Sequence, residues 1–181
     1  MKRKNLYLMC GIPGSGKSTF CNKLIEDSDK KIEYISRDKI RFSFLEDGDD
    51  YFSKEDEVFT TFVSSISDAI DDDHIEEILV DATHLNEKSR NRVLKYLDLD
   101  CVNLIPVNFL IDFDLALKRN NMRDGRSCVP RSSLVNMHSA FRPATHQEKY
   151  PYYKILNVTV TEDGMTVEVD TNDISDIRLT L

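Results

Sequence analysis

A phosphate-binding pattern lies close to the N-terminus. Residues 11–18 read GIPGSGKS and satisfy G-x-x-x-x-G-K-[ST] in full, directly after an apolar run at 6–10. The backbone N–H groups of such a loop point inward at a polyphosphate, and its glycines leave room for the approach. Lys17 would place its charge on the β- and γ-phosphates, the Ser18 hydroxyl would bind Mg²⁺, and the following helix adds the positive end of its dipole. The pattern predicts a nucleoside triphosphate site whose contacts are Gly11, Pro13, Gly14, Ser15, Gly16, Lys17, Ser18 and Thr19.

A single carboxylate stands among cations after the second apolar run. Asp38 follows the run at 32–36 and is surrounded by Arg37, Lys39 and Arg41. A carboxylate in this place can accept the proton of an attacking hydroxyl, while a neighbouring arginine holds an acidic acceptor in line with the γ-phosphate. Because Asp is also a common N-cap residue, Asp38 could cap the helix that follows, alone or in addition.

Asp81 closes a third apolar run, Ile78-Leu79-Val80. In this position a carboxylate binds Mg²⁺ directly or through water. Thr83 and His84 follow at the same edge. We interpret His84 as a polar loop residue and assign it no role.

An arginine-rich segment spans 119–130. It contains Arg119, Arg123 and Arg126, includes Gly125, and ends at Pro130 before a further helical pattern. Such a segment is typical of a lid that folds over a nucleotide and neutralises charge on the phosphoryl group in transfer. The alternative interpretation is a solvated basic loop.

Short apolar runs alternate with amphipathic stretches and position these segments. This alternation predicts an α/β fold, a mainly parallel sheet flanked by helices, with ligands at the carboxyl ends of the strands. We expect strands near 6–10, 32–36, 77–81 and 102–111, and helices at 17–27, 53–70, 86–97, 112–121 and 131–141. Residues 158–161 and 166–169 flank an Asp-Gly turn and predict a C-terminal hairpin. At 181 residues, we expect one domain over 1–181.

Several local features carry expectations of their own. Ser53 and Asp56 form a capping-box pattern at the start of the helix over 53–70. In the helix over 86–97, Arg90 falls on the polar side. The four cysteines lack metal-ligand spacing, and we expect Cys10 and Cys101 to be buried thiols.

The acidic excess is confined to one part of the chain. The net charge is −8, yet residues 42–81 hold one Lys against fourteen Asp and Glu, while residues 1–41 hold ten basic and five acidic residues. We interpret most of 46–57 and 68–77 as a solvated face. The basic segments carry the motifs, so the overall acidity does not exclude a nucleic-acid partner. Reduced cysteines and the lack of a membrane-spanning stretch predict a protein of the cytoplasm, or of the host cytoplasm if it is viral.

Four features together carry a family resemblance. They are the loop Gly11–Ser18, Arg37-Asp38 with Arg41, Asp81-x-Thr83, and an arginine-rich lid that ends in Val129-Pro130. Over roughly residues 5–145 the chain resembles the kinase domain of phage-type polynucleotide 5′-hydroxyl kinases and the wider family of small P-loop kinases, which includes zeta-toxin-like enzymes.

The resemblance implies a P-loop NTPase kinase fold and a role for each motif. Lys17 and Ser18 would serve ATP and Mg²⁺, Asp38 would be the general base on the 5′-hydroxyl of a nucleic acid, and Arg41 would hold its 3′-phosphate. A lid arginine, Arg123 or Arg126, would contact ATP and stabilise the transferring phosphoryl group. The acceptor contacts that we expect are Arg37, Asp38, Arg41, Asp81 and Thr83.

Departures from the family pattern leave alternatives open. The phage enzymes have Asp directly before the Thr, whereas this chain has Asp81-Ala82-Thr83, so Asp81 could serve the metal or the acceptor. The lid is about two residues longer than the family pattern, so Arg123 and Arg126 compete for the catalytic position. There is no room for the phosphatase domain of the phage enzymes, and we expect only the kinase half.

Two rival functions remain. A kinase of a small metabolite, such as a nucleotide sugar or an antibiotic, would use the same phosphate machinery, and the overall acidity favours it. A non-catalytic nucleotide-binding module is the second rival, although Asp38 and the lid arginines are present. A GTPase switch is disfavoured because no Asn-Lys-x-Asp motif occurs after a suitable strand. DNA or RNA, the oligomeric state and the adenine contacts stay open, with Arg142 and Pro143 as a guess for the last.

Overall fold

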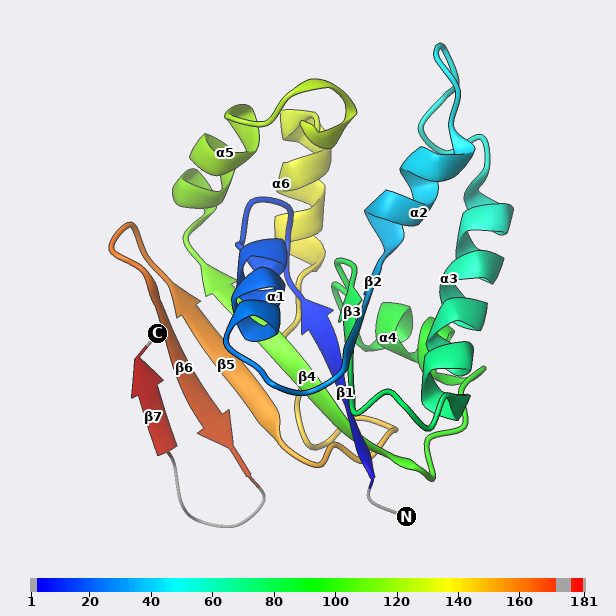
Figure 1. Cartoon of the computed structure of the whole chain (residues 1–181). Helices are drawn as coiled ribbons and strands as arrows, with labels where there is room; N and C mark the ends of the chain where they lie inside the picture. Colours follow the sequence, from blue (N-terminus) through cyan, green and yellow to red (C-terminus); the bar gives the residue numbers. More distant parts are fainter. Residues whose placement is uncertain (1–2, 172–176, 181) are drawn as a thin grey trace.

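A seven-stranded sheet with helices packed around it organises the chain (Figure 1). This computed structural model describes residues 3–171 and 177–180. The strands are β1 (Lys4–Cys10), β2 (Ile32–Ser36), β3 (Glu77–Asp81), β4 (Val102–Ile111), β5 (Ile155–Val160), β6 (Met165–Asp170) and β7 (Ile177–Thr180). The helices are α1 (Lys17–Glu26), α2 (Arg37–Phe44), α3 (Glu55–Asp71), α4 (Glu87–Leu94), α5 (Phe113–Asn121) and α6 (Arg131–Ala140), with a 3₁₀ turn, η1 (Gly125–Ser127), between the last two.

The strand order is β2-β3-β1-β4-β5-β6-β7. The first five strands of this order are parallel, and β6 and β7 continue the sheet in antiparallel fashion. The α/β class, the mainly parallel sheet and the C-terminal hairpin that the sequence predicted are therefore confirmed. β5 and β6 pair from Ile155↔Asp170 to Val160↔Met165 around the expected Asp-Gly turn.

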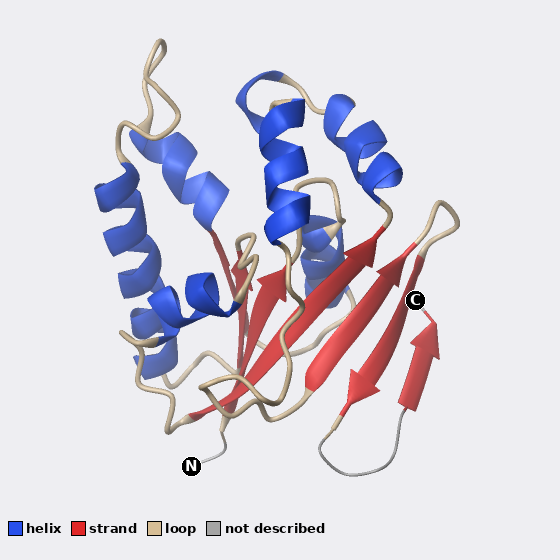
Figure 2. Cartoon of the chain, turned by 180° about the vertical axis from the view of Figure 1, so that it is seen from behind, coloured by secondary structure: helices blue, strands red, loops and turns tan. Residues whose placement is uncertain are grey.

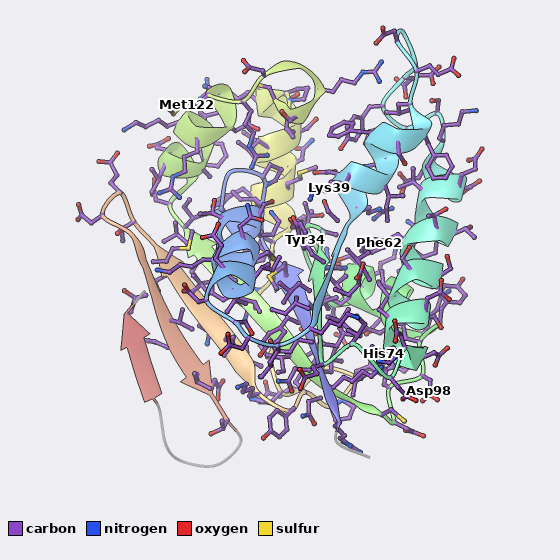
Figure 3. The ribbon with its side chains drawn as sticks, viewed as in Figure 1. Tyr34, Lys39, Phe62, His74, Asp98 and Met122 are labelled. Atoms are coloured by element: carbon purple, nitrogen blue, oxygen red, sulfur yellow. The ribbon has the colours of Figure 1, made fainter. Side chains whose placement is uncertain are left out.

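The parallel register brings the motif-bearing strand ends to one edge. Ser36 of β2 lies beside Asp81 of β3, and Leu8 of β1 lies beside Val80. The residues after β1, β2 and β3 therefore meet at the carboxyl edge, as expected for a parallel sheet. Figure 3 shows Tyr34 and Lys39 near this end of β2, whereas His74 and Asp98 lie toward the opposite end of the sheet.

Alternation along the central strand separates two apolar cores. In β1, Leu6 and Leu8 pack into the core with α3 and α4, whereas Tyr7 and Met9 pack into the core with α1. The central strands β1, β3 and β4 are largely buried on both faces, which is typical of a parallel sheet between helices. A third cluster, around Ala116 and Leu134, joins α5 to α6. Figures 1 and 2 show α5 and α6 beyond the carboxyl ends of the strands. They are separated from α2 and α3, which lie toward the β2 end of the sheet.

Two local predictions about helix ends and sides are wrong. The helix at 53–70 begins at Glu55, and its N-cap residue Lys54 makes no side-chain capping bond. Ser53 instead donates its hydroxyl to the carbonyl oxygen of Asp50, at 2.8 Å, inside the preceding turn. Arg90 is fully buried rather than on a polar side, because residues beyond α6 fold over that side of α4.

The cysteine prediction is correct for one residue and wrong for the other. Cys10 is buried, and burial raises the pKa of its thiol to about 12, so the thiol stays protonated. Cys101 is exposed because it lies in the turn just before β4. Among the described residues, no helix is both long and apolar enough to cross a membrane.

Candidate active site

The loop between β1 and α1 requires glycine at two positions. Gly14 and Gly16 have φ angles of 82° and 90°, a region that other residues rarely adopt. A Cβ on Gly14 would lie 2.4 Å from the carbonyl oxygen of Ala116 in α5, a distance that forbids any side chain. The Ser15 hydroxyl is fully buried in this loop and has no hydrogen-bond partner among the described residues. The loop thus keeps an open backbone and an unused hydroxyl, which fits a bound polyphosphate.

Lys17 turns back over this loop. Its Nζ donates to the carbonyl oxygens of Gly11, at 3.1 Å, and Ile12, at 2.9 Å. Burial lowers the pKa of Lys17. The negative charges of Asp81 and, to a smaller extent, Asp38 raise this pKa, whereas the positive charge of Arg123 lowers it further.

Ser18 and Asp81 form a compact oxygen cluster. The Ser18 hydroxyl donates to Asp81 Oδ2 at 2.7 Å, and the Tyr34 hydroxyl donates to the same oxygen at 2.6 Å. Hard oxygen ligands of this kind suit Mg²⁺, which keeps several waters and binds protein through one or two groups. Among the described residues there is no group of three His, Cys, Asp or Glu that could hold a metal alone. The remaining Mg²⁺ ligands would therefore be phosphate oxygens and water.

The start of α2 forms the other half of the site. The side chain of Asp38 is 66% exposed, while that of Arg41 is only 6% exposed and lies 3.6 Å from the Asp38 carboxylate. The Tyr51 hydroxyl donates to Asp38 Oδ1 and accepts from Arg41 Nη1, each at 3.1 Å. Glu55, in the first turn of α3, pairs with both Arg37 and Arg41. A solvent-facing carboxylate thus lies beside the buried Arg41, which shares Glu55 with the partly buried Arg37.

Asp38 does not cap the helix in which it stands. The N-cap residue of α2 is Ser36, whose hydroxyl accepts from the backbone N–H of Lys39 at 3.4 Å. Asp38 stands in the first turn of α2, where its charge is favoured by the helix dipole but its oxygens stay available. The alternative of a purely capping Asp38 is therefore wrong.

A groove lies beside the phosphate loop. Its volume is about 470 Å³, and it is lined by Gly14, Gly16, Thr19, Phe20, Lys23, Arg119, Arg123, Gly164 and Met165. Arg119 is fixed there by a 3.0 Å bond to the carbonyl oxygen of Thr161 in the β5–β6 turn. Arg142 is not in this lining, and its guanidinium group donates to the carbonyl oxygens of Ser139 and Phe141.

The two candidate lid arginines point to different places. Arg123 lines the groove beside the phosphate loop and lowers the pKa of Lys17 by its charge, after the larger effect of burial. Arg126 instead donates to the backbone carbonyl oxygen of Glu46, at 2.7 Å, in the loop after α2. Asn120, fully buried, closes the base of the lid through two bonds to Val129, of 2.8 and 3.0 Å.

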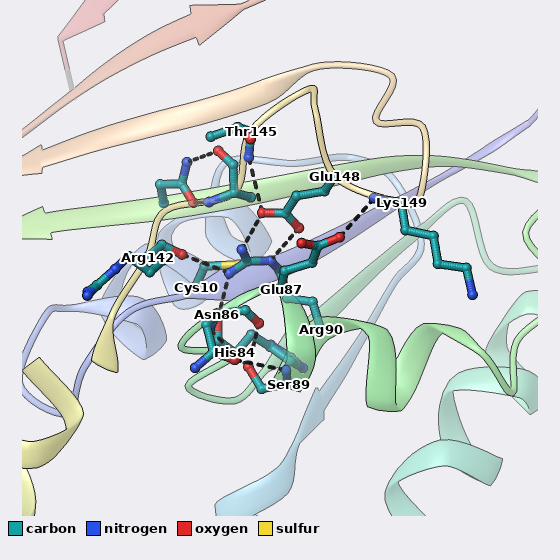
Figure 4. A network of polar contacts seen from close by, with 12 residues as sticks. Cys10, His84, Asn86, Glu87, Ser89, Arg90, Arg142, Thr145, Glu148 and Lys149 are labelled. Carbon is teal, nitrogen blue, oxygen red and sulfur yellow. Dashed lines mark hydrogen bonds and ion pairs between the residues drawn. The ribbon is translucent and has the colours of Figure 1, made fainter. Parts of the chain in front are cut away.

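A buried ion pair joins α4 to the segment after α6 and to the loop after β3 (Figure 4). Arg90 pairs with Glu148 and also donates to the carbonyl oxygens of His84, at 2.9 Å, and Arg142, at 3.1 Å. The Tyr152 hydroxyl donates to Glu148 at 2.7 Å. The loop after β3 is tied in turn to the phosphate loop, because the backbone N–H of Gly11 donates to the Thr83 carbonyl oxygen at 2.8 Å. Thr83 therefore reaches the site through its backbone.

Comparison with known proteins identifies the family. Residues 6–144 match the AAA_33 family model, which is described as an AAA domain. The chain belongs to the AAA_33 family. No curated protein sequence matches this AAA_33 member.

Solved structures with the same fold act on different kinds of acceptor. A chain of the Pnkp1/Rnl/Hen1 RNA repair complex has a TM-score of 0.66 at 19% identity; the match covers 84% of the AAA_33 member but only 52% of that chain. A fungal RNA kinase has a TM-score of 0.57 at 15% identity, with 88% and 77% covered. A sugar kinase from Janibacter sp. HTCC2649 has a TM-score of 0.57 at 14% identity, with 87% and 84% covered. At these identities the likeness shows the P-loop kinase fold alone.

Sequence reasoning missed several residues of the site in this AAA_33 member. Glu55 and Tyr51 lie in the acidic stretch that we interpreted as mostly solvated, and Tyr34 lies within β2. One signal for Glu55 was available in the sequence. It is an acidic residue near the start of the third helix, and it follows the two arginines Arg37 and Arg41, which are spaced to lie on one side of a helix. His84 is buried rather than a polar loop residue; its Nδ1 lies 2.8 Å from the Met9 carbonyl oxygen.

The buried His84 predicts an acid-dependent loss of stability. Burial lowers its pKa to about 4, with the Met9 hydrogen bond opposing, whereas the unfolded chain takes up the proton near 6.5. The free energy of unfolding therefore falls as the pH drops from 6.5 toward 4, by about 2 kcal/mol between pH 7 and 5 for this residue. Urea unfolding of His84→Asn should show a correspondingly weaker pH dependence, and the exposed His74→Asn should match the wild type. Equal pH dependence in all three proteins would contradict the assignment.

Proposed function

We propose that this chain is an ATP- and Mg²⁺-dependent kinase that transfers the γ-phosphate to the 5′-hydroxyl of a polynucleotide. The observation that carries the proposal is the placement of Asp38. Its carboxylate is exposed, is bonded to Tyr51 and lies beside Arg41, and its charge acts on Lys17 of the phosphate loop. An exposed proton acceptor at the same carboxyl edge of the sheet as the phosphate loop suits transfer to a hydroxyl.

The donor half of the mechanism uses the phosphate loop. Backbone N–H groups of the second half of the loop, from Gly14 to Ser18, would bind the β- and γ-phosphates, and the Lys17 ammonium would exchange the loop carbonyl oxygens for these phosphates. Ser18 and Asp81 would hold Mg²⁺, which supplies neutralisation of phosphate charge when bound. The Ser18–Asp81 bond favours the metal role of Asp81 over the acceptor role. The nucleoside occupies the groove between Arg119 and Met165.

The acceptor half of the mechanism starts at Asp38. Its carboxylate accepts the proton of the 5′-hydroxyl as the oxygen attacks the γ-phosphate. The Nε atoms of Arg37 and Arg41 are buried and have no hydrogen-bond partner among the described residues. A buried N–H donor without a partner is costly, so these two donors beside the general base suit a phosphate group of the acceptor, which would supply the missing hydrogen bonds. Arg123 supplies positive charge to the phosphoryl group in transfer.

A kinase of a small metabolite is the second candidate function. It is favoured by Glu55, which neutralises much of the charge of Arg37 and Arg41. The neighbouring loop adds Glu46, Asp47, Asp49 and Asp50, which repel phosphates at that side. A neutral acceptor hydroxyl, such as that of a sugar, would need no basic channel.

The two candidates are separated by an acceptor panel. We expect transfer of labelled γ-phosphate to 5′-hydroxyl DNA or RNA oligonucleotides, none to the same oligonucleotides with a 5′-phosphate, and little to sugars, nucleosides and antibiotics. The kcat/KM for oligonucleotides should fall steeply with salt, since each phosphate contact adds about −0.7 to the logarithmic slope for single strands. Transfer to a metabolite alone would overturn the proposal, and ATP binding without transfer to any acceptor would indicate a non-catalytic module.

A further inference from the structure

An aromatic patch lies beside the proposed general base. We define the patch as Phe42, Tyr51 and Phe52, which come from α2 and from the turn before α3. Tyr51 and Phe52 meet edge to face with ring centroids 4.9 Å apart, and Phe42 and Tyr51 do so at 6.3 Å. Phe52 is 62% exposed and Phe42 is 39% exposed. The α2–α3 connection therefore presents large apolar rings to solvent, which commonly marks a binding surface.

The aromatic patch is joined directly to the acceptor side of the site. Tyr51 belongs to the patch through its ring and to the site through its hydroxyl, which donates to Asp38 Oδ1 at 3.1 Å. The Arg41 guanidinium lies over the Tyr51 ring, 4.5 Å from its centroid, and 5.5 Å from the centroid of Phe52. A group that presents its hydroxyl to Asp38 would thus have its neighbouring part within reach of these rings.

We propose that the aromatic patch stacks the terminal nucleobase of the acceptor strand while its 5′-hydroxyl lies at Asp38. This proposal rests on the polynucleotide kinase function proposed above. Bases stack on exposed aromatic rings whatever their identity, because every base has a π-face. The patch would therefore bind 5′ ends with little sequence preference.

Charge supports a base rather than a phosphate at this surface. The loop beside the patch carries Glu46, Asp47, Asp49 and Asp50 and would repel a phosphate. The Nε donors of Arg37 and Arg41, which have no partner among the described residues, would attract one, and the Arg41 guanidinium lies at the Tyr51 side of the patch. The strand would then place its neutral base on the rings and its first phosphate at the arginines. A metabolite without an aromatic ring would gain little from this arrangement.

The test compares acceptors with and without the terminal base. Short oligonucleotides with a 5′-hydroxyl carry either a base or an abasic residue at the first position. We expect the wild type to phosphorylate the abasic acceptor with a kcat/KM about tenfold lower. Phe52→Ala should lower kcat/KM about tenfold on the base-bearing acceptor and leave the abasic acceptor unchanged. Tyr153→Ala, which removes a ring that is 61% exposed elsewhere, is the matched control and should behave as the wild type.

The outcomes distinguish failure of the stacking proposal from failure of the kinase function. Equal wild-type rates on the two acceptors, or an equal loss on both in Phe52→Ala, would overturn the stacking proposal and leave the kinase function standing. No transfer to any 5′-hydroxyl oligonucleotide would overturn the function and the patch together. The wild-type comparison needs no variant, so a folding defect in Phe52→Ala, monitored by thermal unfolding, would not mask the result.

Discussion

Asp38→Asn is expected to lower phosphoryl transfer about a hundredfold or more while leaving ATP binding near that of the wild type. Asn has the shape of Asp and keeps an oxygen that can accept from Tyr51, so the local geometry at the start of α2 is preserved. What it lacks is a carboxylate that can take the proton of the attacking hydroxyl. Single-turnover transfer to a 5′-hydroxyl oligonucleotide and nucleotide binding by calorimetry measure the two properties separately.

Two comparisons sharpen this prediction. Asp68→Asn removes an exposed carboxylate from α3, away from the site, and should keep wild-type turnover. Tyr51→Phe removes only the hydroxyl that orients Asp38 and should cost much less than Asp38→Asn. Unchanged turnover in Asp38→Asn would exclude Asp38 as the general base. A parallel loss of ATP binding would instead indicate that the charge of Asp38 matters for the nucleotide site itself.

The parts of the fold predicted from the sequence are those that local patterns determine. The phosphate loop follows from glycine spacing, and the hairpin follows from an Asp-Gly turn between alternating runs. The strands β2, β3 and β4 have the predicted bounds because each is a short apolar run between polar turns. The order of those strands places the candidate residues at one edge, as a parallel sheet requires.

The missed features depend on contacts between distant segments. The helical pattern places Arg90 on the polar side of its own helix. This side is buried because a segment far along the chain, which carries Glu148, packs over it and pairs with Arg90. His84 is buried because it packs on Phe62 of α3, with ring centroids 6.3 Å apart. Glu55 lies in an acidic run where solvation is the ordinary outcome, yet α3 packs against α2 and brings it to two arginines. Residue type and spacing could not supply these partners.

Arg123→Ala is expected to lower kcat about a thousandfold, the range found for arginines that stabilise phosphoryl transfer. Arg126→Ala should lower kcat less than about tenfold. The reason is where each side chain lies: Arg123 lines the groove at the phosphate loop and its charge reaches Lys17, whereas Arg126 is bonded to the Glu46 carbonyl oxygen across from the lid. Steady-state measurement of kcat and of KM for ATP and acceptor in both variants tests the assignment.

The two lid arginines should also differ in which kinetic constant they change. Arg126 joins the lid to the loop after α2, so its loss should act mainly on the KM for the acceptor, whose bound end would lie between these segments. Glu46→Ala is the matched control, because it keeps the backbone carbonyl oxygen that Arg126 uses. Arg123→Lys should recover only part of the activity, since an ammonium group keeps the charge but not the planar fork. A larger kcat loss in Arg126→Ala than in Arg123→Ala would reverse the assignment and would require the lid to rotate about Gly125 when the substrates bind.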